Sequence, residues 1–202
     1  MSRIGIFGGT FSPPHNGHVE SAKAFMRELS LDRLIVIPTN VPPHKQHQTC
    51  PPHHRLEMTR LAFVSIEGCE VSDYEINTPG KSYTANTLSH FHNGEDELFF
   101  LCGTDMFLTL HSWYKPELIC SLANIVLVRR DNEAHESILE ADSALKRDFG
   151  ARTIFLENRV LEISSTQIRN LVAAGKDPSH LIPLSVAEYI KENRLYVKED
   201  TP

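Results

Sequence analysis

Two glycines and two histidines follow the first apolar run of the sequence. Residues 4–7 (IGIF) are short and apolar, as in a buried strand, and lead into Gly8 and Gly9. Glycines let a backbone turn sharply and present N–H groups to an anion with no Cβ in the way. His15 and His18 stand three residues apart near the expected start of a helix, where both imidazoles could face one phosphate group. This spacing predicts a phosphate-binding site.

The segment matches neither of two common phosphate-binding motifs, the G-x-G-x-x-G fingerprint and the P-loop. Histidines stand where a P-loop has its lysine. The alternative interpretation is a glycine-rich turn followed by two exposed histidines without a ligand. From these residues alone, both interpretations stay open.

A second candidate anion site lies near the C-terminus, in residues 163–169 (ISSTQIR). Ser164 and Gln167 have the spacing of a helix capping box, and Gly175 stands where a glycine commonly ends a helix. A capped helix start also binds anions when its donors are available, and Arg169 adds a planar fork that suits phosphate oxygens. The structural and the functional interpretation are compatible.

Short apolar runs alternate with amphipathic stretches along the chain, and these elements must position both sites. Strands are expected at residues 4–7, 34–37, 69–76, 98–101, 125–128 and 153–156, and helices at 16–29, 55–65, 82–92, 133–149, 166–174 and 186–193. Nearly all-apolar strands alternating with helices are typical of a parallel sheet covered on both faces. We therefore expect a doubly wound, Rossmann-like α/β fold with ligands at the carboxyl ends of the strands. A single domain over residues 1–196, with a small C-terminal helical part, would precede a frayed polar tail at 197–202.

The composition excludes several classes of protein. The chain has 202 residues, 41% hydrophobic and 23% charged, which argues against disorder. The net charge of −6 argues against a broad basic surface for nucleic acid or an anionic membrane, so any phosphate needs a local site. We find no apolar stretch long enough to span a membrane, no signal peptide, and four cysteines without a C-x-x-C pair. These features predict a cytoplasmic protein with free thiols.

The two candidate phosphate segments together resemble a known family. Residues 8–18 (GGTFSPPHNGH) are similar to the GGTF-x-P-x-HxGH motif of the nucleotidylyltransferase superfamily, and residues 163–169 to its ISSTxxR motif. In spacing and residue type the chain, from residue 4 to about 196, resembles the nicotinate-nucleotide adenylyltransferases. The resemblance implies an enzyme of NAD biosynthesis that makes deamido-NAD (nicotinate adenine dinucleotide) and pyrophosphate from ATP and nicotinate mononucleotide.

The resemblance also implies roles for individual residues. ATP would be bound by Gly8, Gly9, Thr10, Phe11, His15, His18, Gly103, Asp105, Ser164, Ser165 and Arg169. Nicotinate mononucleotide would be bound by Lys45, in a segment like the family's PPHK loop, and by Tyr83, Thr84, Trp113 and Tyr114. The groups expected to act in catalysis are His15, His18, Lys45 and Arg169. Without the resemblance, Asp105 could equally be a helix N-cap and Trp113 a core residue.

The implied reaction needs no protein nucleophile. The 5′-phosphate of nicotinate mononucleotide would attack the α-phosphorus of ATP in line, and pyrophosphate would leave. His18 would contact the α-phosphate and His15 the leaving phosphates. Mg²⁺ is expected as cofactor, bound mainly through the ATP phosphates and not by a dedicated set of protein ligands. We expect no nucleic acid or membrane partner, and homo-oligomerisation is left open.

Two features of the sequence leave alternatives open. Asn86 stands where the family usually has aspartate, which puts in doubt a detail of the segment at residues 80–88. A polar segment could also bind a metal ion through His44, His47, Cys50, His53 and His54, although the spacing fits no known zinc module and solvated histidines are the favoured interpretation.

Two functions rival the favoured one. A sister transferase of the same fold would act on pantetheine phosphate, on nicotinamide mononucleotide or with CTP. A nucleotide-binding sensor that has lost turnover would bind ATP without releasing pyrophosphate. The segments around Lys45, Tyr83 and Trp113 favour nicotinate over the sister substrates, and the intact histidines argue against a sensor.

Overall fold

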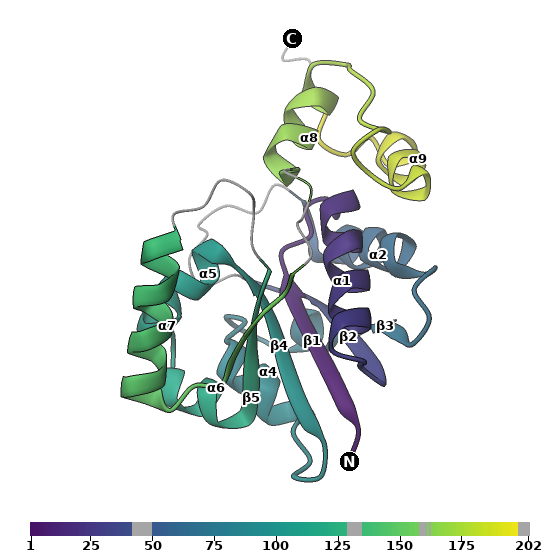
Figure 1. Ribbon diagram of the computed structural model, residues 1–202. Helices are drawn as coiled ribbons and strands as arrows, with labels where there is room; N and C mark the ends of the chain where they lie inside the picture. The colour runs from purple at the N-terminus through teal and green to yellow at the C-terminus, as the bar shows by residue number, and fades with distance from the viewer. Residues whose placement is uncertain (42–49, 129–134, 158–160, 162, 198–202) are drawn as a thin grey trace.

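The computed structural model describes residues 1–41, 50–128, 135–157, 161 and 163–197. Within them, the strands form a parallel sheet in the order β3-β2-β1-β4-β5-β6 (Figure 1). The strands are β1 (Arg3–Gly9), β2 (Arg33–Pro38), β3 (Cys69–Val71), β4 (Glu97–Gly103), β5 (Ala123–Val128) and β6 (Thr153–Phe155). The chain starts in the middle of the sheet, winds outward to β3, and returns to build the other half from β4. This is the predicted doubly wound α/β fold.

Helices cover both faces of the sheet, and each face has its own apolar core. One core includes residues of α1 (Asn16–Glu28), α2 (Pro52–Phe63), α8 (Ser165–Ala173) and α9 (Leu184–Glu192). The other includes residues of α4 (Thr84–Phe91), α5 (Thr104–Thr109), α6 (Pro116–Leu122) and α7 (His135–Phe149). Successive residues of a strand point to opposite faces, so Phe7 packs in the first core and Ile6 in the second. This is why the central strands are apolar throughout.

The register of the central strands opens a crevice at one end of the sheet. Strands β1 and β4 are paired only from Arg3 and Glu97 to Ile6 and Phe100. Beyond that point, Gly8 and Gly9 stay paired with β2, whereas the end of β4 stays paired with β5. The carboxyl ends of β1 and β4 therefore part at the point where the winding direction changes, where ligands bind in open α/β sheets.

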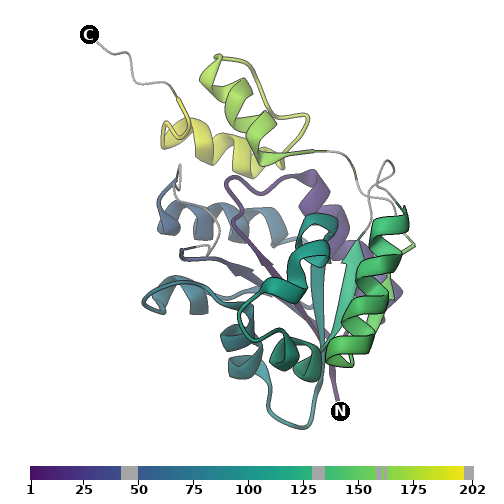
Figure 2. The ribbon, with the colours of Figure 1, turned by 90° about the vertical axis from the view of Figure 1, so that its left-hand side faces the viewer.

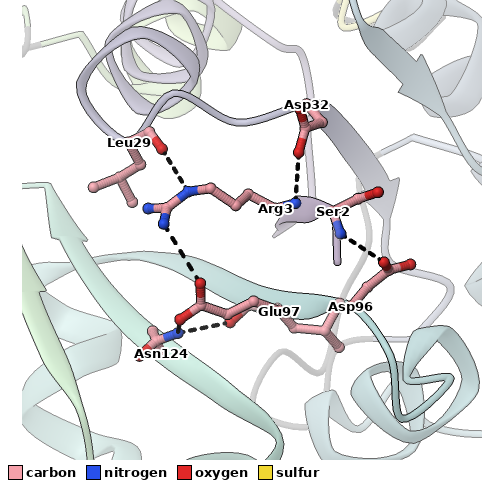
Figure 3. Close-up of polar contacts among 8 residues, drawn as sticks. Ser2, Arg3, Leu29, Asp32, Asp96, Glu97 and Asn124 are labelled. Atoms are coloured by element: carbon pink, nitrogen blue, oxygen red, sulfur yellow. Dashed lines mark hydrogen bonds and ion pairs between the residues drawn. The ribbon is translucent and has the colours of Figure 1, made fainter.

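The opposite end of the sheet is held by a polar network around Arg3 (Figure 3). The Nε of Arg3 donates to the Leu29 carbonyl at 2.9 Å, and its Nη1 lies 3.5 Å from a carboxylate oxygen of Glu97. The backbone N–H of Arg3 donates to Asp32 at 2.7 Å, and Asn124 donates to Glu97 at 2.9 Å. These contacts join β1 to its neighbours on both sides, far from the crevice.

The C-terminal helices lie at the end of the molecule opposite the N-terminus, as both views show (Figure 1 and Figure 2). Ser164 caps α8, because its hydroxyl accepts from the Gln167 N–H at 3.1 Å. Gly175 follows the helix with a φ of +67°, a left-handed conformation that favours glycine. The predicted N-cap at Ser164 and the glycine that follows the helix are confirmed, although of the two hydrogen bonds of a capping box only the one accepted by Ser164 is found here.

Two sequence-based predictions of elements were wrong. The strand expected over residues 69–76 ends at Val71, and α3 (Tyr74–Asn77) follows it, with a hydrogen bond from the Tyr74 N–H to Ser72 Oγ just before the helix. For the stretch between β4 and β5 the only helix considered is one that Asp105 would cap, yet it holds α5, the 3₁₀ turn η1 (Leu110–Ser112) and α6. Each piece is too short to show a clear apolar period.

The ends of the chain and its membrane character were also predicted. Of the expected tail at residues 197–202, only Val197 lies among the described residues, and its side chain is exposed. Within the described ranges, none of the helices has the length and apolar character that crossing a bilayer requires.

Candidate active site

A cavity of about 700 Å³ opens where β1 and β4 part. Most of the predicted site residues line it, from segments far apart in the sequence: Gly8, Gly9, Thr10, Phe11, His15, His18, Tyr83, Thr84, Gly103, Asp105, Trp113, Tyr114 and Ser165. The two candidate halves of the site, for phosphate and for an aromatic ring, therefore share one space.

His15 and His18 cap the first helix for each other. The His18 N–H donates to Nδ1 of His15 at 3.3 Å, and the His15 N–H donates to Nδ1 of His18 at 3.1 Å. The two rings stack with centroids 3.6 Å apart. A nitrogen that accepts a hydrogen bond carries no proton, so in each neutral ring the proton sits on Nε2. His15 is only 7% exposed, so the alternative of two exposed histidines was wrong.

The loop after β1 is shaped by its glycines and by Phe11. A Cβ on Gly9 would lie 2.8 Å from the Phe11 ring, whereas a Cβ on Gly8 would meet nothing within 4 Å. Phe11 itself has a φ of +47°, which is rare for a bulky residue and persists only where the surroundings enforce it. Its buried ring packs edge-on against Phe7 and Phe63. Gly8 thus presents bare backbone to the cavity.

The N-terminus of α8 is tied to the loop that precedes α1. Ser165 Oγ donates to the Pro13 carbonyl at 2.8 Å, and Arg169 Nη1 donates to the Ser12 carbonyl at 2.9 Å. Ser165 lines the cavity, but Ser164 and Arg169 do not. The structure therefore brings the two sequence motifs together, with Arg169 hydrogen-bonded to the candidate phosphate loop (residues 8–15) at Ser12.

Aromatic side chains form the other end of the cavity. Tyr83 and Tyr114 pack with ring centroids 4.7 Å apart. Trp113 is half-buried, and its indole N–H donates to Thr109 Oγ1 at 3.2 Å. The lone tryptophan is therefore fixed in orientation at the cavity wall, where a flat face suits a planar ring.

Gly103, and not Asp105, is the N-cap of α5. Asp105 lies exposed in the first turn of that helix, so the N-cap alternative for it was wrong. Its carboxylate is at the rim of the cavity, and a carboxylate after a strand end is suited to accept hydrogen bonds from ribose hydroxyls.

Glu75 is a buried carboxyl group of the cavity wall that sequence reasoning missed. Thr87 Oγ1 donates to its Oε1 at 2.6 Å, while Oε2 is buried and has no hydrogen-bond partner among the described residues. Burial raises the pKa of Glu75, and hydrogen bonds from Thr87 and Ser82 partly oppose that shift. Thr39, also in the wall, likewise has a buried hydroxyl without a partner in the described ranges.

Arg55 is the second residue that sequence reasoning missed. Its side chain is fully buried although it carries a charge. One signal was available: Arg55 shares a helical face with Met58 and Ala62, three and seven residues further on, and both are buried. A charged residue on the apolar face of a helix indicates a specific task.

The metal alternative receives no support from the described residues. His44, His47 and the predicted Lys45 lie outside them. His53 and His54 are on α2 and not on a loop, and His54 Nδ1 lies 2.9 Å from the Tyr189 hydroxyl. Within the described ranges, no three His, Cys, Asp or Glu side chains are grouped to hold a metal ion.

The departure at Asn86 has a simple structural setting. Asn86 lies in the first turn of α4 with an exposed side chain, and it does not line the cavity. An aspartate at this position would add a favourable charge at the helix N-terminus, which asparagine does not supply.

Comparison with known proteins gives a consistent result. The model of the cytidylyltransferase-like family matches residues 6–171. A probable nicotinate-nucleotide adenylyltransferase from Clostridium botulinum (strain Eklund 17B / Type B) is 36% identical over 98% of this chain and 100% of the relative. One of the same name from Desulfatibacillum aliphaticivorans is 38% identical over 96% and 100%. A Plasmodium falciparum nicotinic acid mononucleotide adenylyltransferase complexed with NaAD shares the fold, with a TM-score of 0.77, 20% identity, and coverage of 97% of this chain and 98% of that one.

Proposed function

The chain belongs to the cytidylyltransferase-like family, and within it we propose that the protein is a nicotinate-nucleotide adenylyltransferase. It joins the adenylyl group of ATP to nicotinate mononucleotide and releases pyrophosphate, a step of NAD biosynthesis. Relatives of that name align with the whole chain, and a protein of the same fold binds NaAD, the product expected here.

The observation that carries the proposal is the shared cavity. Its phosphate end is formed by Gly8, His15 and His18, and its aromatic end by Tyr83 and Trp113. With the polyphosphate of ATP at the first end and the pyridine ring of nicotinate mononucleotide at the second, the reacting groups of the two substrates would meet in the middle of the cavity. Positioning of this kind supplies much of the rate in reactions that need no covalent intermediate.

The attacking group is already an anion, so the residues of the chain need only bind, orient and neutralise. The phosphate of nicotinate mononucleotide attacks the α-phosphorus of ATP, the bond to the β-phosphate oxygen breaks, and pyrophosphate leaves with both electrons of that bond. The Nε2–H groups of His15 and His18 donate to the phosphates, as do backbone N–H groups of the glycine loop. Donors held in place before the reaction stabilise charge that develops on the leaving oxygen.

Arg169 and Ser165 support this site from α8. Since both donate to carbonyls of the Ser12–Pro13 segment, they fix the loop that carries His15. We assign Lys45 and Ser164 to the phosphates on the resemblance of the sequence alone.

Magnesium fits this arrangement when it enters with ATP. The cavity-lining carboxylates among the described residues are Asp105 and Glu75, and they do not form a cluster with a third ligand. Mg²⁺ keeps most of its waters and binds through substrate phosphates in many such sites, where it offsets their negative charge. Of the two carboxylates, the exposed Asp105 is the one suited to contact its water shell.

The location is part of the same proposal. Cys50, Cys69, Cys102 and Cys120 are all free thiols, which supports the cytoplasm as the compartment.

The test is pyrophosphate release from ATP and Mg²⁺, with three acceptors in parallel: nicotinate mononucleotide, nicotinamide mononucleotide and pantetheine phosphate. Release that is much faster with the nicotinate substrate supports the proposal. Equal release with both mononucleotides keeps the chemistry and removes the preference for the acid. No release with any acceptor, from protein that still binds ATP, would favour a sensor and refute the proposal.

A further inference from the structure

Arg55 reaches three separate segments of the chain from one buried position. Its Nε donates to the Cys50 carbonyl at 3.3 Å, and its Nη1 donates to Thr10 at 2.9 Å and to Thr39 at 2.6 Å. Its Nη2 donates to the Asn40 carbonyl at 3.1 Å. The partners in these contacts are backbone carbonyls, whose negative ends surround a fully buried charge. Only a planar guanidinium offers this many donors in fixed directions.

The first contact sets the orientation of the phosphate loop. The peptide that joins Thr10 to Phe11 is trans, so its C=O and N–H point in opposite directions. Thr10 and Phe11 line the cavity and Arg55 does not, so the Thr10 carbonyl is held by a group outside the cavity wall and the Phe11 N–H of the same peptide points away from Arg55. The positive φ of Phe11 needs an external constraint, and this hydrogen bond supplies one at the preceding peptide.

The second contact sets the other end of the cavity. In the peptide that joins Thr39 to Asn40, the carbonyl accepts a hydrogen bond from Arg55, and the N–H donates to Ser82 Oγ at 2.9 Å. The Ser82 N–H in turn donates to the Val41 carbonyl at 3.0 Å. Ser82 directly precedes Tyr83 and Thr84, the residues assigned to nicotinate mononucleotide. A chain of hydrogen bonds therefore runs from Arg55 to the aromatic end of the site.

We propose that Arg55 is a positioning residue, which fixes the phosphate end of the cavity relative to its aromatic end and so sets the alignment of the two substrates. The proposal rests on the proposed function for the identity of the substrates. In-line transfer between two bound substrates depends on their separation, and a displacement of about 1 Å can cost on the order of 100-fold in rate. The loss of Arg55 should therefore lower kcat, and not only weaken binding.

The main variant is Arg55→Lys, which keeps a positive charge but cannot reach all three segments. Arg3→Met is the matched control, because Arg3 also ties backbone and side chains of several segments, but at the opposite end of the sheet (Figure 3). Both variants should lose stability, and their kinetics are compared at temperatures where each is folded. We expect Arg55→Lys to lower kcat at least about tenfold and to raise KM for both substrates, while Arg3→Met keeps both constants near wild type.

Hydrogen exchange tests the same proposal without turnover. In Arg55→Lys, the amides of residues 10–11 and of 82–84 should exchange faster than in wild type, and in Arg3→Met they should not. This readout still applies if the wild type proves inactive with every acceptor, so failure of the proposed function and failure of the positioning role are distinguishable.

Three results would overturn the proposal: normal kcat in Arg55→Lys, an equal loss of kcat in Arg3→Met, or unchanged exchange at both ends of the cavity. If Arg55→Lys does not fold, Ser82→Ala removes one arm of the network. That variant should raise KM for nicotinate mononucleotide more than KM for ATP, and equal effects on the two would contradict the proposal.

Discussion

His18 carries two roles that substitution by asparagine and by alanine separates. Its Nδ1 accepts from the His15 N–H at 3.1 Å and so caps α1, while its Nε2 faces the substrates in the proposed reaction. An asparagine oxygen lies near the position of Nδ1 but does not reach that of Nε2. His18→Asn should therefore keep the cap and lose the phosphate contact, whereas His18→Ala loses both.

The expected magnitudes follow from these contacts. Loss of one preorganised donor costs roughly 2.7–4 kcal/mol of barrier, or about 100- to 1,000-fold in kcat, in both variants. Loss of the hydrogen bond that His18 accepts from the His15 N–H costs about 1 kcal/mol of stability, and only in His18→Ala. The ring also packs edge-on against Phe11 at a centroid distance of 5.1 Å, so the alanine variant leaves space beside the phosphate loop.

Pyrophosphate release with saturating substrates measures kcat, and urea unfolding measures stability. His18→Gln adds a third point, because His18 is the N3 residue of α1, where a glutamine side chain can accept from the N-cap N–H. It should therefore unfold like the asparagine variant and differ in stability from the alanine variant. Turnover near wild type in His18→Asn would refute the assignment of His18 to the phosphates. Equal stability of the alanine and asparagine variants would refute the cap.

Three further changes test the walls of the cavity. Gly8→Ala places a Cβ where nothing in the protein lies within 4 Å, so the stability of the fold should be kept or slightly raised. The KM for ATP should rise, and an unchanged KM would show that Gly8 is not part of the ATP site. Thr39→Val removes a buried hydroxyl that has no partner in the described residues, so the free energy of unfolding should stay equal or increase. The KM for at least one substrate should rise, and unchanged KM values for both substrates would contradict a role of this hydroxyl in binding. Glu75 has a raised pKa because it is buried, so the folded protein binds its proton more tightly than the unfolded chain does. The neutral form of Glu75 makes its full contribution to the stability of the fold below the ordinary pKa of glutamate. This contribution is lost as the pH rises through the raised pKa of Glu75 in the folded protein. Glu75→Gln should therefore match wild type in acid and become relatively more stable as pH rises, and a pH-independent difference in unfolding free energy would refute the shift.

Most of the site could be predicted from the sequence because its signals are local. The glycine loop, the two histidines and the capped start of α8 are each defined within a few residues. Their types also state their chemistry, since bare backbone, imidazoles and a guanidinium fork all suit phosphate.

Some predictions failed because their signals were short or ambiguous. The alternating pattern of residues 69–76 is compatible with a strand, but the strand stops at Val71 and a short helix begins at Tyr74, whose N–H donates to Ser72 Oγ. Residues 104–122 form pieces of helix too short for periodicity to detect. Only the alternative interpretation had His15 exposed, whereas the structure buries it at the start of α1, stacked on His18.

The sequence by itself determined the winding of the chain and the location of its candidate phosphate-binding groups, because apolar periodicity and motif spacing act over short distances. Only the tertiary structure decided which segments face one another across the cavity. Glu75 and Arg55 have ordinary neighbours in the sequence. The raised pKa of Glu75 arises from its burial, and the contacts of Arg55 arise from burial among carbonyls supplied by residues up to 45 positions away. Burial turns an unremarkable charged side chain into one that must be satisfied by specific partners, and those partners exist only once the chain has folded.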